Sequence, residues 1–205
     1  MIDGLTKHVQ DRFWDRIARS VAKTGISADQ VTWIGAALVC VNAAAYVGLQ
    51  RPLVFCAGIV VFELLDDLDG AIARVTGTSS RHGAYLDAMT DRYKDVAVIA
   101  ALAYVHHAWV PAFFGMFGAT ITSYAKARAG MEAPISNAKW PDLFERFERI
   151  AFVCIMLLAV AFVRVDLRDR VVAYGLAIFA LLTNVTAVQR FARARTILRK
   201  HDAKS

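Results

Sequence analysis

The chain has 205 residues, of which 57% are hydrophobic, and its formal net charge is +6. Soluble domains contain about 45–50% apolar residues, so this excess indicates a membrane protein and makes a soluble all-helical domain the weaker alternative. The basic residues stand at the ends of apolar runs rather than along one stripe, which argues against a nucleic-acid-binding protein.

The first 25 residues are predicted to form an amphipathic helix at the membrane interface. Val9, Phe13, Ile17 and Val21 recur every four residues and therefore share one face of a helix. Lysine and arginine residues surround this apolar stripe, as they do in helices that lie on a membrane surface. A surface helix of a soluble domain has a similar pattern, so the apolar runs that follow decide for the membrane.

Five apolar runs follow this segment, over residues 31–49, 53–65, 96–121, 150–163 and 171–188. A helix needs about 20 residues to span the hydrocarbon core. The run 53–65 reaches that length only if its helix continues to about Arg74, and the run 96–121 is long enough for two helices with a break at His106, His107 and Pro111. The sequence therefore predicts an all-α integral membrane domain over residues 1–205, with an interfacial helix at 1–25 and six transmembrane helices within 28–198.

Lysine and arginine residues predict the orientation of these spans. With six spans, the basic N-terminus, residues 74–81, residues 126–149 and the C-terminal tail all fall on one side, which the positive-inside rule assigns to the cytoplasm. The loop 163–170, with three arginines and two aspartates, opposes this assignment. We therefore expect a multi-pass protein of the cell membrane with the acidic cluster and both termini on the cytoplasmic side.

Carboxylates are concentrated where the second and third predicted spans meet. Asp66 and Asp69 are three residues apart and share a helix face, and Asp87 and Asp91 on the next helix are four apart. The loop between the two helices is short, so they run antiparallel and their acidic faces can meet. The sequence predicts that all four carboxylates converge.

Converging carboxylates repel one another unless cations neutralise them. All-oxygen ligands favour Mg²⁺ or Mn²⁺, and four carboxylates suit a pair of ions completed by phosphate oxygens. The spacing alone also permits a proton or ion pathway in a transporter, in which arginine pairs with the acids.

The pattern Asp66-x-x-Asp69-Gly70-x-x-Ala73-Arg74, followed by Gly83, Asp87 and Asp91, resembles the signature of the CDP-alcohol phosphatidyltransferase family. The resemblance implies transfer of a phosphatidyl group from a CDP-linked lipid to an alcohol, with release of CMP. It implies these metal ligands: Asp66, Asp69, Asp87 and Asp91. Asp91 is also implied as the general base. The residues implied to contact the CDP-lipid are Asp29, Gln30, Val31, Thr32, Gly70, Arg74, Ser80 and Gly83.

Three basic residues bear on the acceptor alcohol. Lys126, Arg149 and Arg190 stand on three different predicted spans, at the membrane depth of the acids. Positive-inside anchoring explains each of them singly, whereas together they suit a phosphorylated acceptor. Their segments resemble the prokaryotic phosphatidylinositol-phosphate synthase branch of the family and its archaeal ether-lipid counterpart, which implies inositol 1-phosphate as acceptor. Glycerol 3-phosphate, giving phosphatidylglycerol phosphate, and a non-enzymatic metal-binding membrane carrier are the alternatives.

The resemblance also implies a homodimer, although the sequence does not identify its interface. Gly115, Gly118 and Ala119 offer a surface on which another helix can approach closely. Such residues more often serve packing within one bundle than an interface between subunits.

Overall fold

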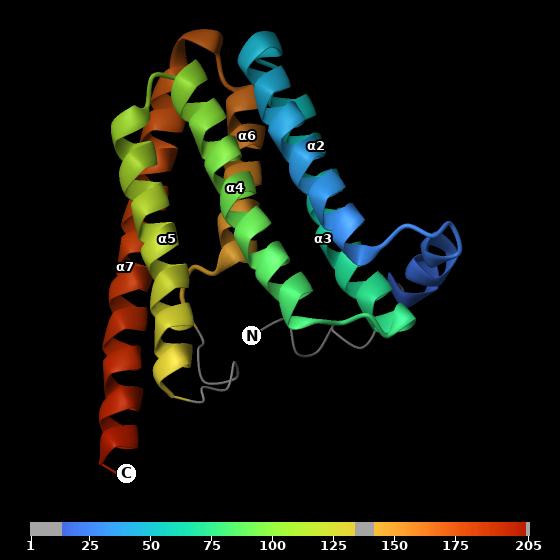
Figure 1. The fold of residues 1–205 in the computed structure, drawn as a ribbon. Helices are drawn as coiled ribbons and strands as arrows, with labels where there is room; N and C mark the ends of the chain where they lie inside the picture. The colour runs from blue at the N-terminus through green and yellow to red at the C-terminus, as the bar shows by residue number, and fades with distance from the viewer. Residues whose placement is uncertain (1–13, 134–141, 204–205) are drawn as a thin grey trace. The chain divides into compact units, whose positions relative to one another are not determined.

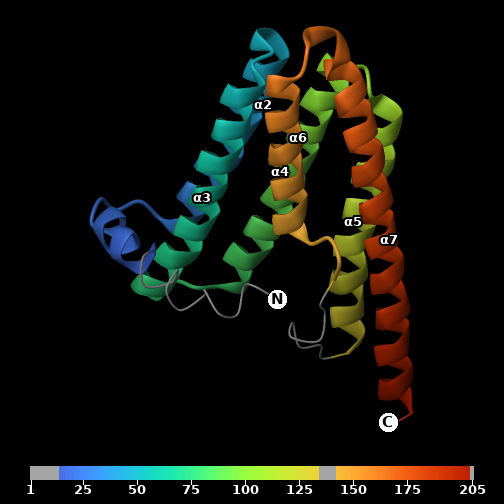
Figure 2. The ribbon, with the colours of Figure 1, turned by 180° about the vertical axis from the view of Figure 1, so that it is seen from behind.

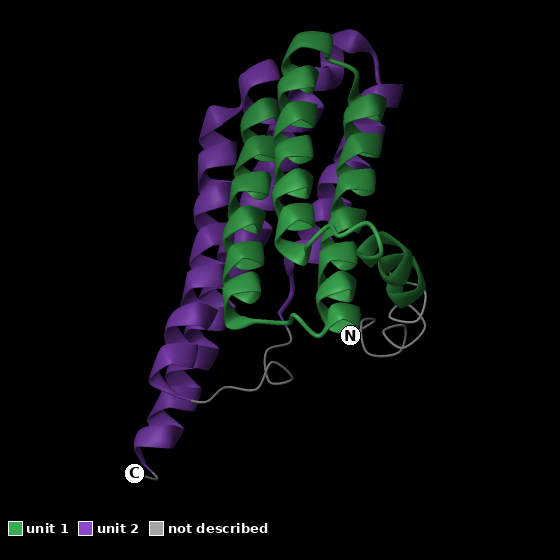
Figure 3. Ribbon diagram, turned by 45° about the vertical axis from the view of Figure 1, so that its right-hand side comes forward, with its two compact units in different colours: residues 1–101 green, residues 102–205 purple. Residues whose placement is uncertain are grey.

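The computed structural model describes residues 14–133 and 142–203, which are helical apart from their connections (Figure 1). The helices are α2 (Ala28–Leu49), α3 (Pro52–Thr76), α4 (Arg81–Val105), α5 (Trp109–Glu132), α6 (Arg146–Phe162), the 3₁₀ turn η2 (Val165–Leu167) and α7 (Arg168–Asp202). No strand occurs in the described ranges, as the all-α prediction requires. The chain divides into two compact units, residues 1–101 and 102–205 (Figure 3), which are described separately below.

In the first unit, α2 and α3 form a tightly packed antiparallel pair (Figure 1). A β-carbon on Gly58 would lie 2.4 Å from Asn42 Nδ2, so only glycine allows this approach. The Asn42 amide donates to the carbonyl oxygen of Phe55 at 3.0 Å, and the rings of Tyr46 and Phe55 stack with centroids 4.4 Å apart. A polar side chain and a glycine at a helix crossing are typical of packing inside a membrane.

Helix α3 runs without interruption through the acidic residues. It begins with Pro52 in its first turn and ends at Gly77, whose φ of 68° is left-handed and favours glycine. The prediction that the apolar run 53–65 continues as helix to about Arg74 is therefore confirmed. A loop of four residues separates α3 from α4, so the acids near the end of α3 lie close to those near the start of α4.

A short helix over residues 14–22 represents the described part of the predicted interfacial helix. Val9 and Phe13, on which that prediction partly depended, lie outside the described residues. The helix buries Ala18 completely in a cluster with Leu68 and Ile72 of α3. Part of its apolar face therefore contacts protein in the first unit.

The predicted break in the long apolar run 96–121 is confirmed. Helix α4 ends at Val105 and α5 begins at Trp109. Between them, His107 adopts a left-handed φ of 53°.

In the second unit, α7 packs against α5 and α6 (Figure 2). A β-carbon on Gly118 would lie 2.7 Å from Thr183 Oγ1, and one on Gly115 would lie 2.7 Å from the ring of Phe179. These glycines therefore allow α5 and α7 of the same chain to pack closely. Gly115 and Gly118 thus serve packing within one bundle. The dimer stays a prediction.

Two helical segments in the described ranges are long and apolar enough to cross a bilayer by length and composition, namely Ala28–Leu49 and Val165–Asp202. The second exceeds the apolar run 171–188 at both ends because α7 continues through the basic tail to Asp202.

Candidate functional site

The carboxylates of Asp66, Asp69 and Asp87 come together in the first unit. One oxygen from each lies within 4.8 Å of the others, so that a single cation could contact all three. Asp69 is buried, with 6% of its surface exposed, and a buried carboxylate requires a cation or hydrogen-bond donors. We call these three residues the carboxylate triad. Its donor set is entirely oxygen, which fits Mg²⁺ or Mn²⁺.

Thr32 of α2 fixes the orientation of the triad from a third helix. Its hydroxyl donates to Asp69 Oδ2 at 2.5 Å and also contacts the carbonyl oxygen of Ala28 at 3.1 Å. Thr32 is itself buried. The hydrogen bond leaves the other oxygen of Asp69 able to face a cation.

Asp91 lies one turn beyond Asp87 on α4 and is joined to the triad through a residue that the sequence interpretation missed. The ammonium nitrogen of Lys94 lies 2.9 Å from Asp91 Oδ1 and also contacts Asp66 Oδ2. Arg92 Nη2 approaches Asp91 Oδ2 at 3.7 Å. Lys94 is three residues after Asp91, a spacing that could have indicated an ion pair on one helix face.

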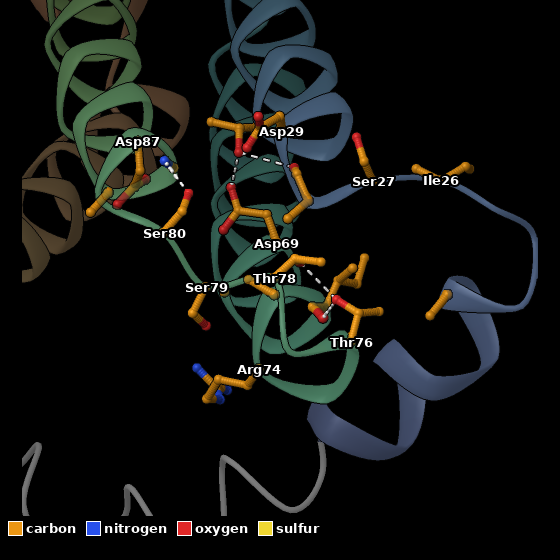
Figure 4. A pocket seen from close by; sticks show the side chains of 18 of the residues that line it. Ile26, Ser27, Asp29, Asp69, Arg74, Thr76, Thr78, Ser79, Ser80 and Asp87 are labelled. Atoms are coloured by element: carbon orange, nitrogen blue, oxygen red, sulfur yellow. Dashed lines mark hydrogen bonds between the residues drawn. The ribbon is translucent and has the colours of Figure 1, made fainter.

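A pocket of about 570 Å³ opens beside the triad, between the N-terminal end of α2, the C-terminal half of α3 and the start of α4 (Figure 4). This volume is in the range of small-molecule and cofactor sites. Figure 4 shows Asp69 and Asp87 at the pocket, with Arg74 further along α3 toward its C-terminus. Six predicted CDP-lipid contacts line it: Asp29, Thr32, Gly70, Arg74, Ser80 and Gly83.

Two glycines line this pocket. A β-carbon on Gly83 would lie 3.4 Å from Ser80 Oγ and 3.7 Å from Asp29 Oδ1. The amide of Gly83 donates to Ser80 Oγ at 3.0 Å, which caps the start of α4. On α3, a β-carbon on Gly70 would lie 3.5 Å from a guanidinium nitrogen of Arg74. Larger side chains at either glycine would project toward the polar groups that line the pocket.

Gln30 and Val31, also predicted to contact the CDP-lipid, are not among the residues that line this pocket. Gln30 is in a capping box, in which its side chain accepts from the amide of Ser27 while the Ser27 hydroxyl accepts from the amide of Gln30. Val31 is buried in the apolar cluster around Leu68. Of this segment, Asp29 and Thr32 line the pocket, whereas Val31 packs against α3 outside it.

Sequence interpretation also missed several lining residues from the connections. Ile26 precedes α2, while Thr78 and Ser79 belong to the loop between α3 and α4. The available signal was the polar run Thr76–Ser80 directly after the acidic helix, because such loops at helix ends supply hydroxyl and amide donors.

The predicted acceptor residues lie in the second unit. Arg149 on α6 and Arg190 on α7 are buried, with 5% and 6% of their surface exposed, whereas Lys126 on α5 is half-buried. Buried guanidinium groups are costly unless they are paired. Positive-inside anchoring alone therefore does not explain the burial of Arg149 and Arg190.

The structure adds an unpredicted carboxylate to this basic group. Arg190 Nε donates to Asp142 Oδ2 at 2.6 Å, and Arg193 Nη1 donates to Asp142 Oδ1 at 2.8 Å. The side chain of Asp142 is completely buried. Arg190 also donates to the carbonyl oxygen of Thr122 at 2.9 Å. Within the predicted basic pocket, the carboxylate of Asp142 thus already pairs with Arg190.

Comparison with known proteins identifies the family to which the chain belongs. A family model described as CDP-alcohol phosphatidyltransferase matches residues 26–186. The archaetidylinositol phosphate synthase of Pyrococcus horikoshii is 31% identical over 182 residues, covering 88% of this chain and 90% of the relative. The phosphatidylinositol phosphate synthase of Mycobacteroides abscessus is 32% identical over 158 residues, covering 73% of this chain and 70% of the relative.

Solved structures agree with the sequence relatives. The crystal structure of Mycobacterium tuberculosis phosphatidylinositol phosphate synthase with CDP-DAG bound is similar with a TM-score of 0.78 and 26% identity, covering 89% of this chain and 94% of that one. A structure of the same enzyme in complex with manganese and citrate also has a TM-score of 0.78. Because the family model spans most of the chain and includes both carboxylate helices, this chain belongs to the CDP-alcohol phosphatidyltransferase family of membrane enzymes.

Proposed function

We propose that this protein makes phosphatidylinositol phosphate by transferring the phosphatidyl group of CDP-diacylglycerol to inositol 1-phosphate. The oxygen of an acceptor hydroxyl forms a bond to the phosphorus that carries the lipid. The bond from that phosphorus to the bridging oxygen breaks, and CMP leaves with the electron pair. The proton of the attacking hydroxyl passes to Asp91, the general base of the proposal.

The observation that carries the donor half is the carboxylate triad at the edge of a pocket lined by Arg74, Gly83 and Ser80. Divalent cations, when bound at the triad, would neutralise the diphosphate, and we propose two ions, Mg²⁺ or Mn²⁺, when the donor is present. Phosphoryl transfer depends mainly on charge neutralisation and in-line placement. Arg74 offers a planar cation for a phosphate, while Thr32 and Asp29 line the α2 side of the pocket, where we place the cytidine.

The acceptor half of the proposal depends on Arg149, Arg190 and Lys126. Two buried guanidinium groups in one unit supply more positive charge than a neutral or cationic alcohol needs. An acceptor phosphate could pair with Arg149 and Lys126 and share Arg190 with Asp142. The named relatives that make inositol-containing lipid phosphates favour inositol 1-phosphate over glycerol 3-phosphate.

We also propose that residues 1–205 form one membrane domain in which α2 to α7 are six spans within residues 28–198, preceded by the interfacial helix at 1–25. At about 1.5 Å per residue, five of these helices exceed the ~30 Å hydrocarbon core. The 17 residues of α6 are at the lower limit of spanning helices. The acids of α3 and α4 lie near their shared connection, which we place on the cytoplasmic side together with both termini. The functional protein is proposed to be a homodimer.

The test is CMP release by the purified protein in detergent with Mg²⁺ and CDP-diacylglycerol. Inositol 1-phosphate, glycerol 3-phosphate, free inositol and serine are compared in parallel, and a dialkyl ether donor is run beside the diacyl one. Release that requires inositol 1-phosphate supports the proposal. Release with glycerol 3-phosphate alone would support a transferase activity but would contradict inositol 1-phosphate as the acceptor.

Three variants separate the roles of the residues. Asp91→Asn should lose turnover at least about 100-fold, the usual effect of removing a general base, whereas a carrier that only binds metal would not depend on proton transfer. Arg190→Ala should raise the acceptor KM and leave the donor KM unchanged. An unchanged acceptor KM in both Arg190→Ala and Lys126→Ala would overturn the acceptor site.

A further inference from the structure

Lys94 on α4 is a buried cation that has no role in the proposed reaction. Only 1% of its surface is exposed, and lysine is almost never fully buried without a partner. Its ammonium group lies between Asp91 of the same helix, at 2.9 Å, and Asp66 of α3. The lysine therefore joins the two carboxylate helices at the level of the site.

Asp66 is shared by two neighbouring arrangements. One of its oxygens contributes to the carboxylate triad with Asp69 and Asp87, and its Oδ2 contacts Lys94. A carboxylate has two acceptor oxygens and can serve both a metal ion and an ammonium group. The ammonium group of Lys94 thus lies where a cation can contact the carboxylates of both Asp66 and Asp91.

Charge balance indicates how many cations the site accepts. The four carboxylates carry four negative charges. Lys94 cancels one, and Arg92, at 3.7 Å from Asp91, offsets part of another. One divalent ion in the triad then brings the site near neutrality. A second ion would be repelled by Lys94 until the diphosphate of the donor brings further negative charge.

We propose that Lys94 is a built-in counter-ion that holds Asp91 against Asp66 and occupies the place of a second divalent cation while no donor is bound. The inference rests on the proposed function in that it assigns the triad to a divalent cation. Lys94 is then a positioning residue. It fixes Asp91, and it restricts the resting site to one ion at Asp66, Asp69 and Asp87.

The experiment is a titration of the purified full chain with Mn²⁺ in the absence of donor and acceptor, with free Mn²⁺ measured by electron paramagnetic resonance. The wild type should bind one ion per chain. Lys94→Met, which keeps an unbranched side chain without its charge, should bind a second ion at least tenfold more tightly than the wild type does. Lys94→Arg keeps the charge and should bind one ion. Lys200→Met on α7 is the control for loss of a lysine elsewhere.

Two equivalent ions on the wild type, or an unchanged isotherm for Lys94→Met, would overturn the role of Lys94 while leaving the proposed function intact. No Mn²⁺ bound by the wild type would overturn the metal assignment of the triad as well. A second pair of variants covers the case in which Lys94→Met does not fold. Asp69→Asn should weaken the first ion at least tenfold, whereas Asp91→Asn should weaken it several-fold less, because Asp91 acts on that ion through Lys94 and Asp66. Equal weakening by both would place Asp91 in the shell of the first ion and overturn the proposal.

Discussion

At the scale of single residues, Thr32 of α2 contacts the carboxylate triad directly, although it lies outside α3 and α4. Its hydroxyl donates to Asp69 at 2.5 Å, and a hydrogen bond to a charged group is worth about 1.5–3 kcal/mol. Thr32→Val keeps the shape of the side chain and removes the donor, so Asp69 loses its orientation. We expect Mn²⁺ affinity to fall about tenfold, measured by the same titration of the purified chain.

The matched control for this change is Thr186→Val. Thr186 is equally buried, and its hydroxyl donates to the carbonyl oxygen of Leu182 in its own helix. Mn²⁺ affinity equal in the two variants would show that the Thr32 hydroxyl does not orient Asp69.

Asp142 is the buried counter-ion of Arg190 and Arg193. Asp142→Asn leaves both guanidinium groups without that carboxylate, and breaking a buried ion pair costs about 3–5 kcal/mol. We expect unfolding in detergent, followed by circular dichroism, to shift to lower temperature. Inorganic phosphate should restore more stability to this variant than to the wild type, because an anion can then pair with Arg190.

Asp166→Asn is the control for this effect. Asp166 pairs with Arg164 at the surface, at 3.1 Å, where an ion pair contributes about 0–1 kcal/mol. If Asp142→Asn unfolded at the same temperature as this control, Asp142 would not be the counter-ion that stabilises Arg190.

The grouping of Asp66, Asp69 and Asp87 was predictable, because residues three or four apart on a helix share a face, which is a local property. The contacts of Lys94 with Asp66 and of Asp142 with Arg190 were not predictable. Lys94 resembled the other basic residues at the ends of spans, and only the packing of α3 against α4 brings it to Asp66. Asp142 belongs to a connector without periodicity, so nothing in the sequence linked it to α7, almost 50 residues later.

At the scale of elements, the crossing of α5 and α7 depends on glycine. A β-carbon on Gly118 would lie 2.7 Å from Thr183 Oγ1 and 2.8 Å from the backbone nitrogen of Asn184. Gly118→Ala should therefore force the helices apart and lower the free energy of unfolding by about 1–3 kcal/mol, the usual cost of overpacking. Thermal unfolding in detergent measures the change.

Gly130→Ala in the same helix is the matched control, for which we expect no loss of stability. Nothing lies within 4 Å of a β-carbon at Gly130, and alanine is favoured over glycine in a helix by about 1 kcal/mol. This variant should be unchanged or slightly more stable. A Gly118→Ala protein as stable as Gly130→Ala would mean that α5 and α7 do not cross as closely as described.

The helices themselves were largely predictable. The break at His106 and His107 and the continuation of α3 past Leu65 both follow from length, because a span requires about 20 residues. The apolar run of the last helix ends at Val188, whereas α7 continues to Asp202, four residues beyond the predicted bound of 198. The basic segment that follows is rich in alanine, arginine and leucine, which favour helix without being apolar as a group.

At the scale of the whole molecule, the proposed orientation predicts which loops a membrane-impermeant maleimide can reach. After replacement of Cys40, Cys56 and Cys154 by alanine, single cysteines are introduced as Ser79→Cys or Val165→Cys. Three helices separate these positions, so six spans place them on opposite sides. In intact cells Val165→Cys should be labelled, and Ser79→Cys only after permeabilisation.

Lys200→Cys is the matched position near the C-terminus and should behave like Ser79→Cys. Labelling of Ser79→Cys and Val165→Cys from the same side would contradict the count of spans. Labelling of all three positions in reverse would contradict only the orientation.

Composition and hydropathy predicted the membrane class, but they did not give the number of spans unaided. Helices α3 and α4 carry the acids and basic residues of the site within their own length, which lowers their apolar content. Only α2 and the segment containing α7 meet a test of length and composition among the described residues. The charged residues of the site therefore keep α3 and α4, two of the proposed spans, from meeting this test.

Helix α7 has a practical consequence for imaging. Its 35 residues make it about 50 Å long, some 20 Å more than the hydrocarbon core. Ala194 near its C-terminal end still packs against Ala129 of α5, so this projecting part is anchored by side-chain contacts. A helical protein fused in register after Asp202 would continue α7 as one rigid rod. Such a fiducial would give a chain of 205 residues the size and asymmetry that particle alignment in electron microscopy requires.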